Sequence, residues 1–255
     1  MKIVMIGAGN LATHLSKALY DTGFDIVQVY SRSKRSATDL ADALKTNYTV
    51  SIDKIVTDAS LYIISVSDDA ISGLVDRLPV KEQLVVHTAG SVPMDIFSGK
   101  LENYGVMYPL QTFSKERPVD FSNIPVFIEA SSSGNLEKLR MVTQKVSSRV
   151  YEMPSDKRIY LHLSAVFGCN FVNSMYGVAA DILQETGCSF DVLSSLILET
   201  AQKAIISNDP GKVQTGPAIR KDQHVMNKHI ALLSDHPEWQ DLYIQISRFI
   251  KKQAE

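Results

Sequence analysis

The sequence predicts an α/β fold in which a doubly wound, mostly parallel β-sheet is followed by an all-α region. Two observations predict it. Over residues 1–153, short and fully apolar segments, typical of parallel strands covered on both faces, alternate with helical patterns. Over residues 154–255, no segment alternates apolar and polar residues with period two, and helical patterns follow one another instead. The change of period therefore predicts two domains, 1–153 and 154–255.

The first strand is expected at residues 3–6 and the first helix from Asn10, with two glycines in the turn between them. Gly7 permits a tight turn, and Gly9 lets the backbone approach a ligand closely. The first helical turn, with Asn10 and Leu11, points unpaired N–H groups at an anion such as a pyrophosphate. This pattern predicts a Rossmann-type dinucleotide site. The alternative is an ordinary strand-to-helix turn.

The segment after the second strand, residues 25–30, carries no carboxylate. An NAD-binding protein normally places Asp or Glu there to bond the ribose hydroxyls. This chain has hydroxyl and cationic side chains instead, and we assign cofactor contacts to Ser31, Arg32, Ser33 and Arg35. Because these groups suit a 2′-phosphate, the sequence predicts NADP(H) over NAD(H). The alternative is a solvated basic loop.

The alternation continues with a helix at 36–44, a short strand at 48–51, a helical turn around Ile55, a strand at 61–66, a helix at 70–78 and a strand at 83–87. In an open parallel sheet, ligands lie at the carboxyl ends of the strands. We therefore expect the residues that end these two later strands to face the cofactor: Val66, Ser67, Thr88, Ala89 and Gly90. Plain turn and cap chemistry is the alternative for the adjacent Asp68 and Asp69.

Further strands are expected at 104–108, 125–129 and 149–153, with a helix at 136–146 before the last of them. Four helical segments then follow: 155–187, 190–206, one after residues 215–222, and 235–252. The long first segment is apolar on more than one side, as is typical of a helix shared between subunits. We therefore expect a homodimer formed through the helical domain.

Composition excludes several classes of function. The 255 residues are 45% hydrophobic and 21% charged, with a net charge of −2, which gives no general attraction to nucleic acid or to an anionic membrane. No apolar run reaches the ~20 residues of a transmembrane helix, and no signal peptide is expected. Cys169 and Cys188 are expected to be free thiols in a reducing cytoplasm. No metal site is proposed, because the histidines lack ligand spacing.

Five strings follow one another along the chain: GAGNLA, VSDDAI, HTAGS, GVMYPLQTFS and TGPAIRKD. With them the sequence resembles the Rossmann-like NADP oxidoreductases that carry a C-terminal helical domain of formerly unknown function, the DUF2520 type. It is more distantly similar to pyrroline-5-carboxylate reductase, prephenate dehydrogenase and the 6-phosphogluconate and hydroxyisobutyrate dehydrogenases. The resemblance implies NADP(H) in the first domain and a small-molecule substrate between it and the helical domain. It also implies that the helical domain is similar to the C-terminal domain of 6-phosphogluconate dehydrogenase.

The resemblance also directs attention to the first helix of the second domain. There the hydroxyacid dehydrogenases carry a catalytic Lys one turn before an Asn, whereas this chain has Val166 before Asn170. His162 lies one turn earlier on the same face. An imidazole can transfer a proton near neutral pH, and an Asn can orient a substrate oxygen. A satisfied core histidine with a polar interhelical contact is the alternative. Prephenate dehydrogenases have His where this chain has Tyr108, which argues against prephenate chemistry.

Arg220 follows Thr215, Gly216 and Pro217, where it could hold a substrate carboxylate with two hydrogen bonds. The alternative is a surface arginine paired with Asp222. The sequence thus predicts an oxidoreductase that uses NADP(H) to transfer a hydride to or from a small carbonyl, imine or hydroxy acid, with His162, Asn170 and Arg220 as catalytic candidates. The other reading is a sensor or interaction module that binds NADP(H) without chemistry.

Overall fold

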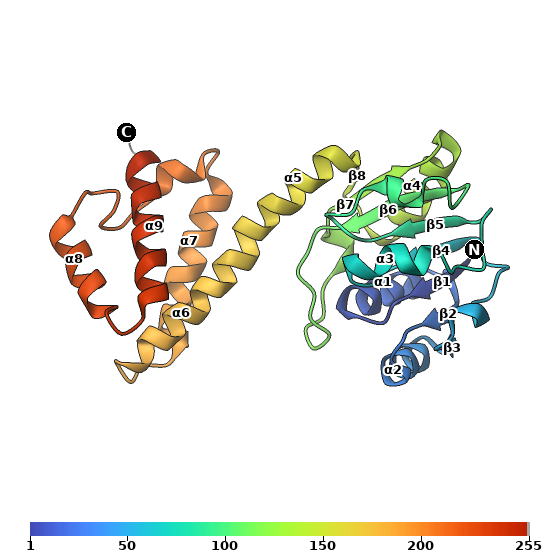
Figure 1. The fold of residues 1–255 in the computed structure, drawn as a ribbon, viewed down its shortest axis with the longest axis horizontal. Helices are drawn as coiled ribbons and strands as arrows, with labels where there is room; N and C mark the ends of the chain where they lie inside the picture. Colours follow the sequence, from blue (N-terminus) through green and yellow to red (C-terminus); the bar gives the residue numbers. More distant parts are fainter. Residues whose placement is uncertain (254–255) are drawn as a thin grey trace. The chain divides into compact units, whose positions relative to one another are not determined.

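The computed structural model describes residues 1–253 and divides into two compact units (Figure 1). The first unit is Met1–Gly168, and the second begins at Cys169. Each unit is described by itself below. The division falls later in the chain than the boundary expected at residue 153, because the first turns of the long helical segment pack on the first unit.

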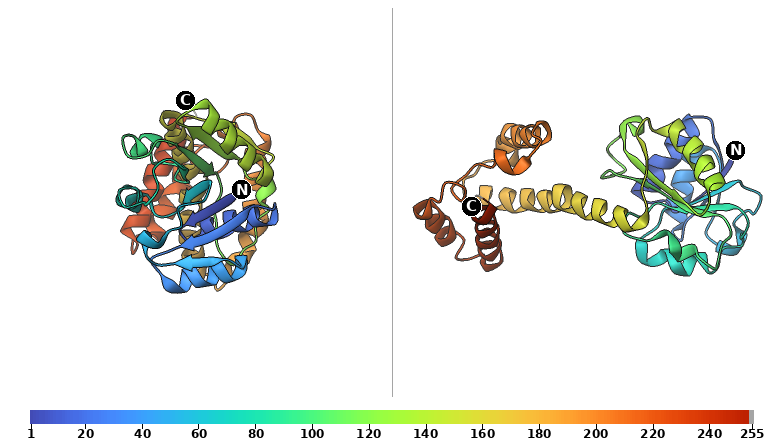
Figure 2. Two further views of the ribbon diagram at one scale, coloured as in Figure 1. Left: turned by 90° about the vertical axis from the view of Figure 1, so that its right-hand side faces the viewer. Right: turned by 90° about the horizontal axis from the view of Figure 1, so that it is seen from above.

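Among the described residues, eight strands form one sheet, whose mostly parallel arrangement confirms the predicted fold class. They are β1 (Lys2–Ile6), β2 (Asp25–Tyr30), β3 (Asn47–Thr49), β4 (Leu61–Ile64), β5 (Leu84–His87), β6 (Tyr104–Pro109), β7 (Val126–Ala130) and β8 (Val150–Glu152). The order across the sheet is β3-β2-β1-β4-β5-β6-β7-β8. All neighbours run parallel except β6 and β7. The left view of Figure 2 shows the strands of this unit side by side.

Helices cover both faces of the sheet, because successive side chains of each strand point to opposite faces. On β1, Ile3 and Met5 belong to one apolar core and Val4 and Ile6 to the other. The first core is closed by α1 (Asn10–Asp21), α2 (Lys34–Leu44) and α4 (Ser133–Val146). The second is closed by α3 (Asp68–Val75) and the 3₁₀ helix Met94–Phe97. Burial on both faces explains why the strands read as continuous apolar runs.

The chain reverses direction across the sheet at β1. The strands β2 and β3 extend from one side of β1, and β4 to β8 extend from the other. The connections from β1 to α1 and from β4 to α3 therefore both begin at the carboxyl end of the sheet. They then diverge, because α1 lies on one face of the sheet and α3 on the other. A crevice at this switch point is where open α/β sheets bind ligands.

The helix α5 (Ser155–Ala165) is fastened to the sheet by buried polar contacts. Ser155 Oγ donates to Glu129 Oε2 of β7 at 2.6 Å, and Arg158 Nη1 donates to the same oxygen at 2.7 Å. Arg158 also donates through Nη2 to the carbonyl of Val92 at 2.6 Å. One turn later, Leu161 packs against the cluster of Val106, Tyr108 and Phe127. These contacts make α5 part of the first unit.

The second unit contains only helices and loops among its described residues. A π-helical stretch, Val166–Phe171, follows α5, and the unit continues with α6 (Val172–Gln184), α7 (Ser194–Ile206), α8 (Gln223–Leu232) and α9 (Pro237–Gln253). The pair α8 and α9 is joined by a contact of 2.9 Å between His229 Nδ1 and the Tyr243 hydroxyl. Within the described part of this unit, the only buried apolar residues are Ala218 and Met226. The second unit thus has almost no core of its own.

Candidate functional site

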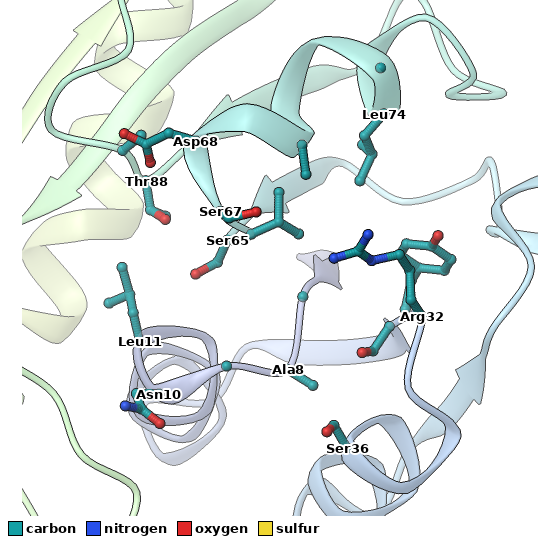
Figure 3. A pocket seen from close by; sticks show the side chains of 18 of the residues that line it. Ala8, Asn10, Leu11, Arg32, Ser36, Ser65, Ser67, Asp68, Leu74 and Thr88 are labelled. Carbon is teal, nitrogen blue, oxygen red and sulfur yellow. The ribbon is translucent and has the colours of Figure 1, made fainter.

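A cavity of about 820 Å³ opens at the carboxyl ends of β1, β2, β4 and β5. Its lining comes from the first unit alone. The residues are Gly7, Ala8, Gly9, Asn10, Leu11, Tyr30, Ser31, Arg32, Ser36, Ile52, Ser65, Val66, Ser67, Asp68, Ala70, Gly73, Leu74, Arg77, Thr88, Ala89, Gly90 and His162. Figure 3 shows Arg32 and Ser36 on one side of this cavity, Asp68 and Thr88 on the opposite side, and Ala8 between them.

The glycine turn forms the middle of the cavity. Gly7 has a φ of +123°, and its N–H donates to the carbonyl of Tyr30 at 2.8 Å. A side chain at this position would overlap the backbone carbonyl of Ser65, the residue that follows the neighbouring strand β4. At Gly9, by contrast, a Cβ would meet nothing within 4 Å, because the residue faces the open cavity. Gly7 is therefore required by the fold, whereas Gly9 leaves room for a ligand.

The start of α1 is left open toward the cavity. Its N-cap residue is Gly9, so no side chain caps the first N–H groups, and no acidic residue lies in the first turn. The Asn10 side chain turns to the loop after β6, where Nδ2 donates to the carbonyl of Phe113 at 2.9 Å. What the helix offers a ligand here is its unpaired backbone N–H groups and the positive end of its dipole. This arrangement suits a pyrophosphate.

One end of the cavity combines cations with apolar surface. Ser31 and Arg32 line it as expected, together with Ser36 of α2 and Arg77 after α3. The apolar part comes from Tyr30, Ile52 and Leu74. An apolar slot beside two guanidinium groups and two hydroxyls fits an adenosine that carries a 2′-phosphate.

Ser33 and Arg35, which we also expected to contact the cofactor, lie outside this lining. The Ser33 hydroxyl accepts from the N–H of Ser36 at 3.3 Å and caps α2. The Arg35 side chain is 92% exposed and sits 3.9 Å from Asp39. The sequence alone does not show which serines and arginines of this basic segment face the cavity, because that depends on where α2 begins.

The other end of the cavity is polar and lies beside α5. Val66, Ser67, Thr88, Ala89 and Gly90 line it, as the strand-end argument predicts. Asp68 joins them, and its carboxylate accepts a hydrogen bond from the Ser91 hydroxyl. His162 reaches the same end from α5.

His162 is held by a tyrosine that sequence reasoning assigned no role in the site. Its Nδ1 lies 3.1 Å from the hydroxyl of Tyr108, the residue before the proline that ends β6. Burial raises the pKa of the Tyr108 hydroxyl above its ordinary value, and the positive charge of Arg158 opposes that rise. Gly90 makes room for the pair, because a Cβ there would lie 2.7 Å from His162 Nδ1 and 2.7 Å from Tyr108 Cζ.

A second histidine, His87, holds the turn that leads into Gly90. His87, fully buried at the end of β5, accepts at Nδ1 from the N–H of Ala89 at 3.2 Å and packs on Phe97. Burial, aided by the charge of Arg158, lowers the pKa of His87 to about 3. A neutral imidazole that accepts at Nδ1 carries its proton on Nε2. His87 is thus a neutral structural residue that orients the chain leading into Gly90.

The other two catalytic candidates belong to the second unit. Asn170 lies in the π-helical stretch and is exposed. Arg220 follows the buried Ala218 in the loop before α8 and is also exposed. The neighbouring Asp222 serves as the N-cap of α8, where it accepts from the N–H of Val225 at 3.1 Å. The roles of Asn170 and Arg220 remain predictions.

The sequence analysis missed several lining residues. Tyr30 and Ser65 lie at or next to the carboxyl ends of expected strands, so the strand-end rule could have found them. Ser36, Ile52, Leu74 and Arg77 come from helices and connections whose approach to the cavity depends on tertiary packing. Arg77 in particular reads in the sequence as an ordinary surface cation.

The cavity fits a dinucleotide in size and in chemistry. Its volume lies within the roughly 300–1,000 Å³ of small-molecule and cofactor sites.

Within residues 1–253, no group of three His, Cys, Asp or Glu side chains could hold a metal ion. No helix in that same range is long and apolar enough to cross a membrane.

Comparison with known proteins gives two family matches along the chain. Residues 2–90 match the family described as NADP oxidoreductase, coenzyme F420-dependent, and residues 124–250 match the domain of unknown function DUF2520. No curated protein matches the sequence.

Solved structures extend the match over the whole chain. A Bacteroides fragilis protein described as a “putative NADP oxidoreductase” is 48% identical, with a TM-score of 0.92 and 98% of each chain covered. A Streptococcus pyogenes 1-pyrroline-5-carboxylate reductase is 14% identical, with a TM-score of 0.64 and coverage of 97% of this chain and 98% of that one. An imine reductase from Myxococcus stipitatus, in complex with NADP⁺, is 15% identical, with a TM-score of 0.66 and coverage of 99% and 94%. The last two likenesses show a shared fold.

Proposed function

The chain belongs to the family of two-domain proteins in which an NADP oxidoreductase domain precedes a DUF2520 domain, and we propose that it transfers a hydride between NADP(H) and a small carbonyl, imine or hydroxy acid. The observation that carries the proposal is that one cavity is lined both by a dinucleotide cradle at Gly7–Leu11 and by an ionisable side chain, His162, at its far end. A dinucleotide that spans this cavity brings its nicotinamide to the end where His162 lies.

The two ends of the cavity orient the cofactor. Arg32 and Arg77 attract the 2′-phosphate, and the slot of Tyr30, Ile52 and Leu74 accommodates the adenine. The backbone N–H groups at the start of α1 bind the pyrophosphate. The nicotinamide then occupies the polar end of the cavity, beside Thr88 and Gly90.

The residues at the nicotinamide end supply proton transfer and orientation. The bound cofactor gives or takes the hydride. His162 supplies or removes the proton on the substrate heteroatom, because an imidazole can do both near neutral pH. In this proposal Asn170 orients the substrate heteroatom and Arg220 binds a substrate carboxylate. A keto acid or a cyclic imino acid would use all three side chains.

The alternative, a sensor that binds NADP(H) without chemistry, predicts that side chains block the space beside the nicotinamide. The cavity instead continues past Thr88 and Gly90 to His162, which favours the enzyme. The deciding experiment incubates the purified protein with NADPH and a panel of cyclic imines, keto acids and aldehydes. Consumption of NADPH with at least one compound, reduced in His162→Gln, is expected. Tight NADPH binding without consumption across the panel would support the sensor.

We further propose that the protein acts as a homodimer joined through the second unit. Large apolar side chains of that unit are exposed among its described residues, including Leu196, Leu198, Ile205, Ile206 and Leu232. Ile205 and Ile206 are each 82% exposed. Because the described part of this unit buries only two apolar residues, a second copy of the chain would supply the missing core.

Sedimentation at micromolar concentration tests the dimer. A species of twice the 28.2 kDa chain mass is expected, and Ile206→Glu should shift it toward the monomer. Val50→Glu is the matched control, because Val50 is an exposed apolar residue of the first unit. A wild-type protein that sediments as a single chain would contradict the proposal.

We also propose that the protein is cytoplasmic. Cys169 and Cys188 are both free and exposed, which is typical of a reducing compartment. Cell fractionation of a tagged chain tests this, and recovery from an oxidising compartment would contradict it.

A further inference from the structure

We propose that Tyr108 and His162 form a proton relay, in which the Tyr108 hydroxyl donates to Nδ1 of His162 and Nε2 of His162 delivers the proton to the substrate heteroatom. The inference rests on the proposed function and adds a positioning residue to it. Tyr108 does not itself line the cavity. It stands behind His162, with only 8% of the residue exposed.

The geometry of the pair supports a direct hydrogen bond. The Tyr108 hydroxyl lies 3.1 Å from His162 Nδ1, and the two rings meet edge to face with centroids 6.0 Å apart. Tyr108 is fixed by β6 and by its contact with Phe127, and His162 by α5. The pair can form only because residue 90 is glycine, since any side chain there would overlap both rings.

The relay requires Tyr108 to be the donor in this hydrogen bond. Because burial raises the pKa of the Tyr108 hydroxyl, the phenol keeps its proton near neutral pH and has it to donate. In the relay, Nδ1 of His162 accepts this hydrogen bond. A neutral imidazole has one N–H, so its proton sits on Nε2, the nitrogen that Tyr108 leaves free for the cavity.

The charges around Tyr108 decide what happens when it loses its proton. Arg158, one turn before His162 on α5, is the cation that acts on Tyr108, and Asp68 of α3 is the anion. Arg158 is itself held by Glu129 of β7 at 2.7 Å. The positive charge of Arg158 stabilises a transient phenolate at Tyr108, while its partner Glu129 keeps the guanidinium in place.

The relay balances without an additional reactant. The substrate carbon gains the hydride and its electron pair from NADPH, and the π pair of the C=O or C=N bond moves to the heteroatom. The heteroatom forms a bond to the Nε2 proton as that N–H bond breaks. Nδ1 takes the Tyr108 proton as the O–H bond breaks. Tyr108 ends as a phenolate and regains a proton from solvent after the product leaves.

The first test needs no substrate. Long-range ¹H–¹⁵N spectra of ¹⁵N-histidine-labelled protein, with and without NADP⁺, report which nitrogen of each imidazole carries the proton, and His162→Gln assigns the resonance. We expect the Nε2–H form of His162 in the wild type and a mixture of tautomers in Tyr108→Phe. Tyr104→Phe, which removes a hydroxyl from the same strand, should leave the spectrum unchanged. The Nδ1–H form in the wild type, or no change in Tyr108→Phe, would overturn the relay.

The second test uses any substrate that the panel identifies. Tyr108→Phe should lower kcat by about 10- to 100-fold, with little change in the affinity for NADPH. This loss is smaller than the roughly 10²–10⁴-fold contribution of a general acid, because His162 itself stays in place. The solvent deuterium isotope effect on kcat should rise in this variant, because proton delivery becomes slower. Unchanged turnover in Tyr108→Phe overturns the relay, whereas absence of turnover in the wild type overturns the proposed function itself.

Discussion

Arg158 Nη1 lies 2.7 Å from Glu129 Oε2, and this buried ion pair holds α5 against the sheet. The Arg158 side chain is 1% exposed and that of Glu129 is 17% exposed. His162 follows Arg158 by four residues and so lies on the same face of the helix. The position of the one ionisable side chain that α5 brings to the cavity therefore depends on an ion pair outside the cavity lining.

Arg158→Leu should destabilise the first unit by about 3–5 kcal/mol, because it leaves the Glu129 carboxylate in a largely buried place without its cation. Denaturant unfolding of the variant measures this loss. Replacing both partners, Arg158→Leu with Glu129→Leu, should recover most of it.

The matched control is Arg140→Leu. Arg140 pairs with Glu152 and Glu137, but these carboxylates are exposed, so the cost should stay within about 0–1 kcal/mol. Equal losses for Arg158→Leu and Arg140→Leu would show that the buried pair has no special part in holding α5.

The sheet and its helices were largely predictable from the sequence, because strands that are buried on both faces need continuous apolar runs such as residues 61–64. Glu129 and Arg158 were not. Each lies in a predicted element, one strand and one helix, yet their pairing depends on how the two elements pack. A lone charge on an amphipathic helix usually faces solvent, so nothing in the sequence marked Arg158 as buried.

Arg32→Ala should weaken binding of NADPH by about 10- to 100-fold and that of NADH much less, since hydrogen bonds to charged groups contribute about 1.5–3 kcal/mol each. Fluorescence titration with the two cofactors measures the difference. Arg35→Ala is the matched control, because Arg35 is exposed beside Asp39 and lies outside the cavity lining. A variant at Arg32 that still prefers NADPH as strongly as the wild type would contradict the assignment of the 2′-phosphate end.

Substitution of the two glycines should have separable effects. Gly7→Ala should lower Tm, because its Cβ would overlap the Ser65 carbonyl and because the backbone φ of +123° disfavours any side chain. Gly9→Ala should leave Tm almost unchanged, because its Cβ meets no atom within 4 Å, and should weaken NADPH binding instead. Thermal melts and titrations on both variants separate the two roles. Loss of Tm in Gly9→Ala would refute this division.

Protonation of His87 should destabilise the fold in acid. Its folded pKa of about 3 lies below the ordinary value of 6.5, so the stabilisation is present above pH 6.5 and is lost as the pH falls toward 3. The difference corresponds to a loss of up to roughly 4–5 kcal/mol across that window. His87→Gln, which keeps a hydrogen-bond acceptor for Ala89, should flatten the dependence of unfolding free energy on pH. The exposed His224→Gln serves as the control, and identical pH profiles for the two variants would contradict the prediction.

The candidate site was predictable where local geometry decides it. Gly7, Thr88 and Gly90 follow from the rule that parallel strands present their carboxyl ends to a ligand. Tyr108 and Arg77 could not be found in this way. The first reaches His162 through the packing of α5 on β6, and the second reaches the cavity through the turn after α3. Such contacts join segments far apart in the sequence, and no local pattern encodes them.

The most direct test of the account is the structure of the complex with NADP⁺. The central claim is that the nicotinamide lies beside Gly90, where His162 can exchange a proton with a substrate held over the ring. We expect C4 of the nicotinamide within about 6 Å of His162 Nε2, which leaves room for one substrate atom at ~3–3.5 Å from each. A nicotinamide that binds more than about 10 Å from His162, beyond the reach of a single bridging water, would contradict the claim.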